Sequence, residues 1–126
     1  MSIDILQAQL RDKVSAEVRV AGEGDDRYRV FTPFMFDDGD HLSIVLKRIG
    51  GQWILSDESN TFMHLSYELD DESLREGTRQ KIISSALSLF DVAEHDGELT
   101  HLVRGEEYGD ALHTYVQALL RIADIT

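Results

Sequence analysis

The chain has 126 residues, no cysteine, 12 Lys and Arg against 24 Asp and Glu, and a formal net charge of −12. This length predicts one domain over residues 1–126 that is large enough to bury its own core. Without cysteine, disulfides and thiolate-based metal or catalytic sites are excluded, and zinc remains open only through His and carboxylate ligands.

The first half of the chain predicts one helix followed by strands. Ile3, Leu6, Leu10 and Val14 recur at helical spacing. Pro33 predicts an edge, a bulge or a bend within its strand, and Gly50-Gly51 predicts a tight hairpin anchored by Trp53. The predicted elements are a helix over residues 2–15 and strands over 16–20, 28–36, 42–47 and 52–55.

The second half predicts helices around a further hairpin. Asp96-Gly97 is the predicted hairpin turn, and Ser73 and Glu76 have the spacing of a capping box that would start a helix. The predicted elements are a helix over 61–69, a helix with a buried face of Ile82, Ile83, Ala86, Leu87 and Phe90, strands over 91–94 and 98–103, and a helix over 106–125. The last helix carries an apolar stripe of Tyr108, Leu112, Tyr115, Leu119 and Ile122.

Taken together, these elements predict an α+β fold in the order α-ββββ-α(α)-ββ-α. The two groups of strands can form one antiparallel sheet with flanking helices on one face. The N-terminus has neither the basic start nor the apolar run of a signal peptide, and no apolar stretch is long enough to span a bilayer. We therefore expect a cytoplasmic protein.

The negative charge sets expectations about partners. It disfavours direct binding to nucleic acids and to anionic membranes, because both repel an acidic surface. It favours a protein partner with a basic surface, through electrostatic complementarity. The alternative is that the acidity serves only solubility.

Candidate metal ligands form two short groups. Asp37, Asp38 and Asp40 precede His41 and offer oxygen ligands for Mg²⁺ or Ca²⁺, although the spacing lacks the Glu of a Ca²⁺-binding loop, and Asp-Gly-Asp is also a common hairpin turn.

The second group, Asp57 and Glu58, follows a strand, as carboxylates do in many metal-dependent nucleases. The alternative is a helix cap at Asp57 or Ser59. Four carboxylates, Asp38, Asp40, Asp57 and Glu58, are thus the candidate ligands of a metal-dependent hydrolase. The sequence has no nucleophile elbow, phosphate-binding loop or zinc-helix motif, so it predicts no catalytic residue and no cofactor.

Several aromatic residues lie on the first predicted strands, and most of them are expected to be buried in the core. Three consecutive large apolar residues, Phe34, Met35 and Phe36, cannot all face one side of a strand. At least one must face a helix, a partner or solvent. With Asp37, Asp38 and Asp40 they form the predicted partner-binding segment.

Three stretches resemble the bacterial and phage family called domain of unknown function 1828. They are Val30-Phe31-Thr32-Pro33-Phe34, Asp38 to Ile44, and Trp53 to Glu58 followed by Thr61-Phe62, and the resemblance covers about residues 5–70. The family prefers glycine where this chain has Ser59. The resemblance implies a prokaryotic, phage or mobile-element setting and supplies no catalytic residues. The layout also resembles that of type III secretion chaperones, which are dimeric.

Two classes of function follow. The leading hypothesis is a non-enzymatic protein-binding module, an inhibitor of a host defence or nucleic-acid-binding protein, or else a chaperone- or antitoxin-like partner. The rival is a metal-dependent nuclease or hydrolase. A homodimer is expected from the chaperone-like layout.

Overall fold

The structure is a computed structural model that describes residues 2–125. Its elements, in chain order, are α1 (Ile3–Lys13), β1 (Arg19–Gly22), β2 (Arg27–Phe31), β3 (Ile44–Ile49), β4 (Gln52–Ser56), α2 (Asn60–Leu65), α3 (Asp71–Leu74), α4 (Gly77–Leu89), β5 (Ala93–His95), β6 (Glu98–Leu102) and α5 (Tyr108–Ala123). This order confirms the predicted α+β fold.

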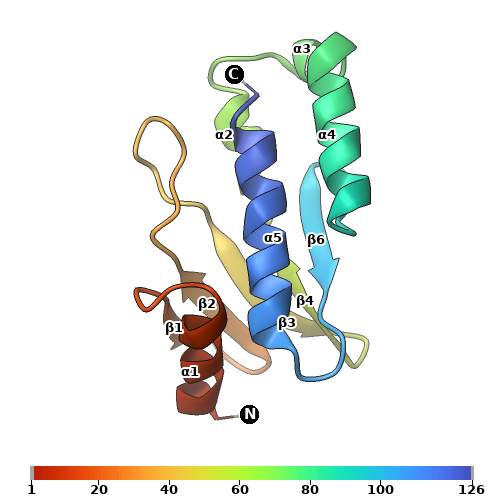
Figure 1. The fold of residues 1–126 in the computed structure, drawn as a ribbon. Helices are drawn as coiled ribbons and strands as arrows, with labels where there is room; N and C mark the ends of the chain where they lie inside the picture. The colour runs from red at the N-terminus through yellow and green to blue at the C-terminus, as the bar shows by residue number, and fades with distance from the viewer. Residues whose placement is uncertain (1, 126) are drawn as a thin grey trace.

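The six strands form one antiparallel sheet in the order β1-β2-β3-β4-β6-β5. Helices α1, α4 and α5 lie on one face of this sheet, and α5 runs between the other two (Figure 1). Both predicted hairpin turns are confirmed, because Gly50 and Gly51 have φ of 59° and 78°, and Asp96 and Gly97 have φ of 50° and 90°. No helix of residues 2–125 is long and apolar enough to cross a membrane.

The core lies between α5 and the covered face of the sheet. Four residues of the predicted α5 stripe are fully buried, and Tyr108 is partly buried. From the sheet, Val30, Ile44, Leu46, Leu55 and Leu99 pack into the same core. The hydroxyl of Tyr115 donates a hydrogen bond of 2.6 Å to the carbonyl of Leu99, which ties α5 to β6.

Several predicted boundaries are wrong. The strand expected over 16–20 begins only at Arg19, because residues 16 and 17 form a turn in which the N–H of Val18 donates to the carbonyl of Ser15 at 3.1 Å. The strand expected over 28–36 ends at Phe31, and the chain bends at Pro33 as predicted.

The predicted capping box is also wrong. Ser73 lies inside α3, because the carboxylate of Asp70 accepts a hydrogen bond from its backbone N–H, and α4 starts only at Gly77. On α4 the buried residues are Ile83 and Ala86, whereas Ile82 is exposed.

Gly109 lets α1 and α5 pack closely. A Cβ built there would lie 2.5 Å from Lys13 Cγ and 2.9 Å from the carbonyl oxygen of Gln9. We expect Gly109→Ala to lower the free energy of unfolding by about 1–3 kcal/mol, because overpacking forces the helices apart. The matched control is Gly22→Ala, where a Cβ meets nothing within 4 Å. Urea denaturation of both variants checks this, and equal stability of the two would contradict the close helix crossing.

Candidate functional site

An arm of the chain, residues 32–43, projects from the sheet between β2 and β3, beside α2 (orange to yellow in Figure 1). The arm is a short hairpin, in which the N–H of Leu42 donates to the carbonyl of Phe34 and the N–H of Phe36 donates to the carbonyl of Asp40, at 3.0 and 2.8 Å. Met35 and His41 form an isolated bridge between its two sides. The predicted Asp-Gly-Asp turn is therefore confirmed as its tip, where Gly39 has φ of 92°.

Phe36 fastens the arm to α2. Its side chain is buried and stacks on the ring of His64, with the ring centroids 3.8 Å apart and an interplanar angle of 11°. The same histidine contacts the arm's carboxylates, with Nε2 3.0 Å from Asp38 and Nδ1 3.6 Å from Asp40. The arm and α2 thus form one continuous surface, which we call the acidic end.

Apolar side chains are exposed on the acidic end. Met35 is 49% exposed, and Met63 and Tyr67, on and just after α2, are 52% and 71% exposed. Of the three consecutive apolar residues singled out in the sequence, Met35 is exposed, Phe34 is partly buried and Phe36 faces the core. Sequence reasoning missed Met63 and Tyr67. The sequence could have indicated them, because both are large apolar residues that do not lie on the buried helix face formed by Phe62 and Leu65.

Negative charge is concentrated at this end of the molecule. Residues 32–43 and 60–74 contain seven of the 24 Asp and Glu residues of the chain and none of its 12 Lys and Arg residues. Elsewhere on the sheet, acidic side chains pair with Arg or Lys, as Glu58 does with Arg27. Arg75 borders this end, with its guanidinium over the ring of Phe62 at 4.9 Å, and it pairs with Glu94. The two segments themselves contain no cation that offsets their seven carboxylates.

Asp57 is a structural residue. It is 1% exposed, and its carboxylate accepts hydrogen bonds from the backbone N–H groups of Ser59, Thr61 and Leu99, at 3.0, 3.1 and 2.9 Å. Burial raises the pKa of Asp57, although these hydrogen bonds oppose the shift. Of the two predicted cap residues, Ser59 occupies the N-cap position of α2, but its side chain makes no cap hydrogen bond. Asp57, two residues earlier, instead accepts a hydrogen bond from the N–H of Thr61 in the first turn of α2, and it joins this turn to Leu99 of β6.

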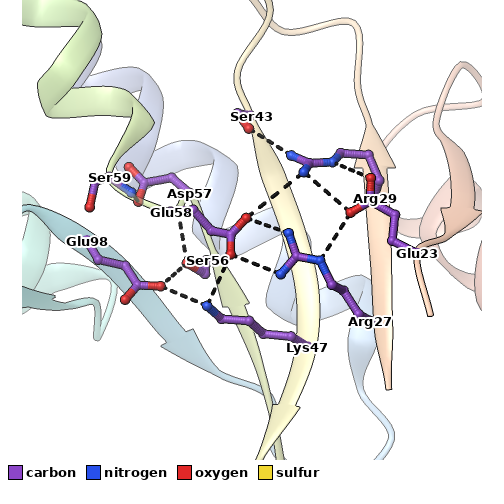
Figure 2. A network of polar contacts seen from close by, with 10 residues as sticks. All are labelled: Glu23, Arg27, Arg29, Ser43, Lys47, Ser56, Asp57, Glu58, Ser59 and Glu98. Carbon is purple, nitrogen blue, oxygen red and sulfur yellow. Dashed lines mark hydrogen bonds and ion pairs between the residues drawn. The ribbon is translucent and has the colours of Figure 1, made fainter. Parts of the chain in front are cut away.

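Glu58 belongs to a charged network on the face of the sheet opposite the helices (Figure 2). Arg27 donates two hydrogen bonds to its carboxylate, at 2.9 and 2.6 Å, and Lys47 lies 3.4 Å from it. Lys47 also contacts Glu98 at 3.0 Å, and Glu98 accepts a short hydrogen bond from the hydroxyl of Ser56.

The same network covers apolar surface. Glu23 joins it by bridging Arg27 and Arg29. In the sheet register Val45 lies between Arg29 and Ser56, and it is fully buried. The network therefore balances charge and shields this apolar centre.

We expect the network to make the protein acid-sensitive. Arg27 and Lys47 lower the pKa of Glu58 to about 2, below its usual 4.5. A carboxylate whose folded-state pKa is lowered stabilises the fold above its unfolded pKa and loses that contribution as the pH falls through its folded pKa. Between pH 4.5 and 2 the free energy of unfolding should therefore fall more steeply in the wild type than in Glu58→Gln.

Urea denaturation at a series of pH values checks this slope. Asp57 acts in the opposite sense, because its raised pKa favours the folded state as the pH falls. The comparison with Glu58→Gln isolates Glu58, since Asp57 is present in both proteins. Glu107→Gln, at an exposed position outside the network, should leave the slope unchanged. Equal slopes in the wild type and Glu58→Gln would contradict the role of the network.

The turn between β4 and α2 is strained. Glu58 and Ser59 have φ of 49° and 68°, in the left-handed region that favours glycine. We expect Ser59→Gly to raise the free energy of unfolding by about 1 kcal/mol, because it relieves this strain. Ser85→Gly, in the middle of α4, should lower it by about as much. Thermal melts compare the two, and destabilisation by Ser59→Gly would refute the strain.

The four predicted metal ligands do not form one site. The carboxylate of Asp57 accepts hydrogen bonds from backbone N–H groups, and the carboxylate of Glu58 pairs with Arg27 and Lys47. Asp38 and Asp40 instead meet His64, which the sequence analysis did not connect with them. Of the side chains that the structure describes, these three are the His, Asp and Glu group close enough together to hold an ion.

The fold and the acidic end define a small α+β domain with one helix-covered antiparallel sheet and a projecting acidic arm. The chain belongs to the family described as domain of unknown function DUF1828, whose model matches residues 32–122. That match confirms the family resemblance found in the sequence from residue 32 onward and extends it to residue 122, while residues 5–31 of the resemblance lie outside the match. No curated protein and no solved structure matches the chain significantly.

Proposed function

We propose that the chain is a protein-binding module whose acidic end docks on a basic surface of its partner. One observation supports this proposal. Two joined segments together contain seven acidic residues and three exposed apolar side chains, and they contain no Lys or Arg. Apolar contacts supply affinity at the centre of an interface, while complementary charge supplies specificity and speed of association.

The chemistry of the acidic end suggests what the partner is. A surface that presents several carboxylates competes with phosphates for Lys and Arg side chains, so we propose a nucleic-acid-binding protein as the target and inhibition as the outcome. The family resemblance implies a prokaryotic, phage or mobile-element setting, and for such a setting we propose a host defence protein as the target. A chaperone or antitoxin would use the same surface, but on a partner that is unfolded or toxic when alone.

The nuclease alternative receives no support from the geometry. Its four carboxylates lie in two different places, and two of them already have backbone or Arg partners. The homodimer also stays a prediction. The α5 stripe packs inside the domain, so a dimer needs another surface, and light scattering would detect it.

Selection from a random library of 12-residue peptides tests the proposed surface. We expect the selected peptides to carry net positive charge and apolar residues. Their binding should weaken about tenfold or more when the salt concentration rises from about 0.05 to 0.5 M, because salt screens exposed charges. Selection of neutral or acidic peptides would refute the proposal.

Two pairs of variants locate the binding surface. Asp37→Asn, Asp38→Asn and Asp40→Asn together should abolish binding of the selected peptides. Asp12→Asn, Asp25→Asn and Glu106→Gln together remove the same charge from exposed positions elsewhere and should not. For the apolar part, Met63→Ser with Tyr67→Ser should weaken binding, whereas Ile5→Ser with Ile49→Ser, at comparably exposed positions, should not. Equal effects within either pair would place the binding surface elsewhere.

A further inference from the structure

The acidic end contains a mixed nitrogen and oxygen cluster that charge alone does not explain. One oxygen each from Asp38 and Asp40 and one ring nitrogen of His64 all lie within 4.8 Å of one another. They come from two separate segments, the tip of the arm and α2. The fold, rather than local sequence, brings them together.

His64 is held in place for this contact. Its side chain is 13% exposed, with Phe36 stacked on one side and Tyr67 packed edge-on at 5.5 Å. The two aspartate side chains are more exposed, at 54% and 70%. Oδ1 of Asp38 accepts a hydrogen bond of 3.0 Å from the N–H of Asp40, and its Oδ2 faces His64. A fixed imidazole, a carboxylate held by the turn and a more exposed carboxylate are a set of ligands that an ion of the Zn²⁺ type accepts.

The cluster places an imidazole nitrogen beside two carboxylates. Nε2 of His64 lies 3.0 Å from Asp38, and Nδ1 lies 3.6 Å from Asp40. An ion held by one ring nitrogen would take an oxygen of each carboxylate as a further ligand, and its charge would offset the repulsion between the two carboxylates.

We propose that Asp38, Asp40 and His64 bind a divalent transition-metal ion of the Zn²⁺ type. Ligands about 2.1 Å from Zn²⁺ lie roughly 3 to 3.5 Å apart, and His64 Nε2 and Asp38 are already at 3.0 Å. Imidazole selects Zn²⁺ over Mg²⁺ and Ca²⁺, which prefer oxygen alone. Beside the cluster lies a cavity of about 80 Å³, lined in part by Asp38, His64 and Glu68, with room for water ligands. The site shares Asp38 and Asp40 with the proposed partner-binding surface, but ion binding does not require the partner.

Calorimetric titration of the full chain with ZnCl₂ at neutral pH tests the site. We expect one ion per chain, and a melting temperature higher by about 5 to 10 °C at a free Zn²⁺ concentration 100 times the Kd. Mg²⁺ and Ca²⁺ should give much smaller shifts. Co²⁺ in place of Zn²⁺ should give the visible absorption of a four- or five-coordinate ion, which weak surface binding would not produce.

Matched variants assign the ligands. His64→Gln and Asp40→Asn should each weaken Zn²⁺ binding by about tenfold or more. Asp40→Asn guards against a folding defect, because its side chain is exposed. Asp37→Asn, on the same turn, and His113→Gln, on the exposed side of α5, should change the Kd by no more than about twofold.

Three results would overturn the proposal. The first is no heat and no thermal shift with Zn²⁺, Mn²⁺ or Co²⁺. The second is undiminished binding in His64→Gln and Asp40→Asn. The third is equal weakening in Asp37→Asn, which would indicate a diffuse counter-ion. All three measurements use the protein alone, so their outcome is separate from that of the peptide selection.

Discussion

Replacing Asp57 with alanine should lower the free energy of unfolding by about 3–5 kcal/mol, because it leaves three backbone N–H groups without an acceptor in a buried place. Each such group costs about 1–3 kcal/mol, and the fold can relax to recover part of this. A domain of this size has only about 5–15 kcal/mol of stability. The variant should therefore be close to unfolding at ordinary temperature, as seen in urea denaturation followed by circular dichroism.

Asp57→Asn is a milder substitution at the same position. The amide keeps one acceptor oxygen but turns an NH₂ group toward a backbone N–H, so we expect an intermediate loss of about 2 kcal/mol. The control is Asp25→Ala, at an exposed turn position, which should change stability by less than about 0.5 kcal/mol. An Asp57→Ala variant as stable as Asp25→Ala would show that Asp57 does not hold β4, α2 and β6 together. A catalytic or metal-binding role would then need to be reconsidered for this residue.

Replacing Phe36 with alanine should have the second-largest effect, a loss of about 3 kcal/mol or more. The substitution removes a buried aromatic ring and its stacking on His64. The arm should also detach from α2. Faster hydrogen exchange at the amides of Phe36 and Leu42, which close the arm's own hydrogen bonds, would report this detachment.

The neighbouring residue supplies the control for Phe36. Met35→Ala, at an exposed position of the same arm, should change stability by less than about 0.5 kcal/mol and leave amide exchange unchanged. Met35→Ala should, however, weaken the binding of the selected peptides if Met35 contacts the partner. If Phe36→Ala leaves the exchange of Leu42 unchanged, the arm is held by its own backbone and not by α2.

Periodicity along the chain was sufficient to predict the fold class. Leu42, Ile44 and Leu46, spaced two residues apart, predicted a strand with one buried face. The four-and-three spacing predicted α5, and one sheet under α5 buries both faces. The Gly50-Gly51 pair predicted its hairpin turn from the local sequence alone, because both glycines adopt the positive φ that the turn requires. Net charge, a property of composition, predicted an acidic surface.

Tertiary structure decided what the charged residues do. Asp57 and Glu58 are adjacent in sequence, yet one is buried against backbone N–H groups and the other pairs with Arg27, 31 residues away. The sequence suggested one metal site from four carboxylates, whereas the fold joins two of them to His64, a histidine 24 residues beyond Asp40. Side-chain period predicts which residues are buried, but pairing of polar groups depends on distances between elements. The order of the strands sets those distances for Asp57 and Glu58, and the packing of the arm against α2 sets them for the cluster around His64.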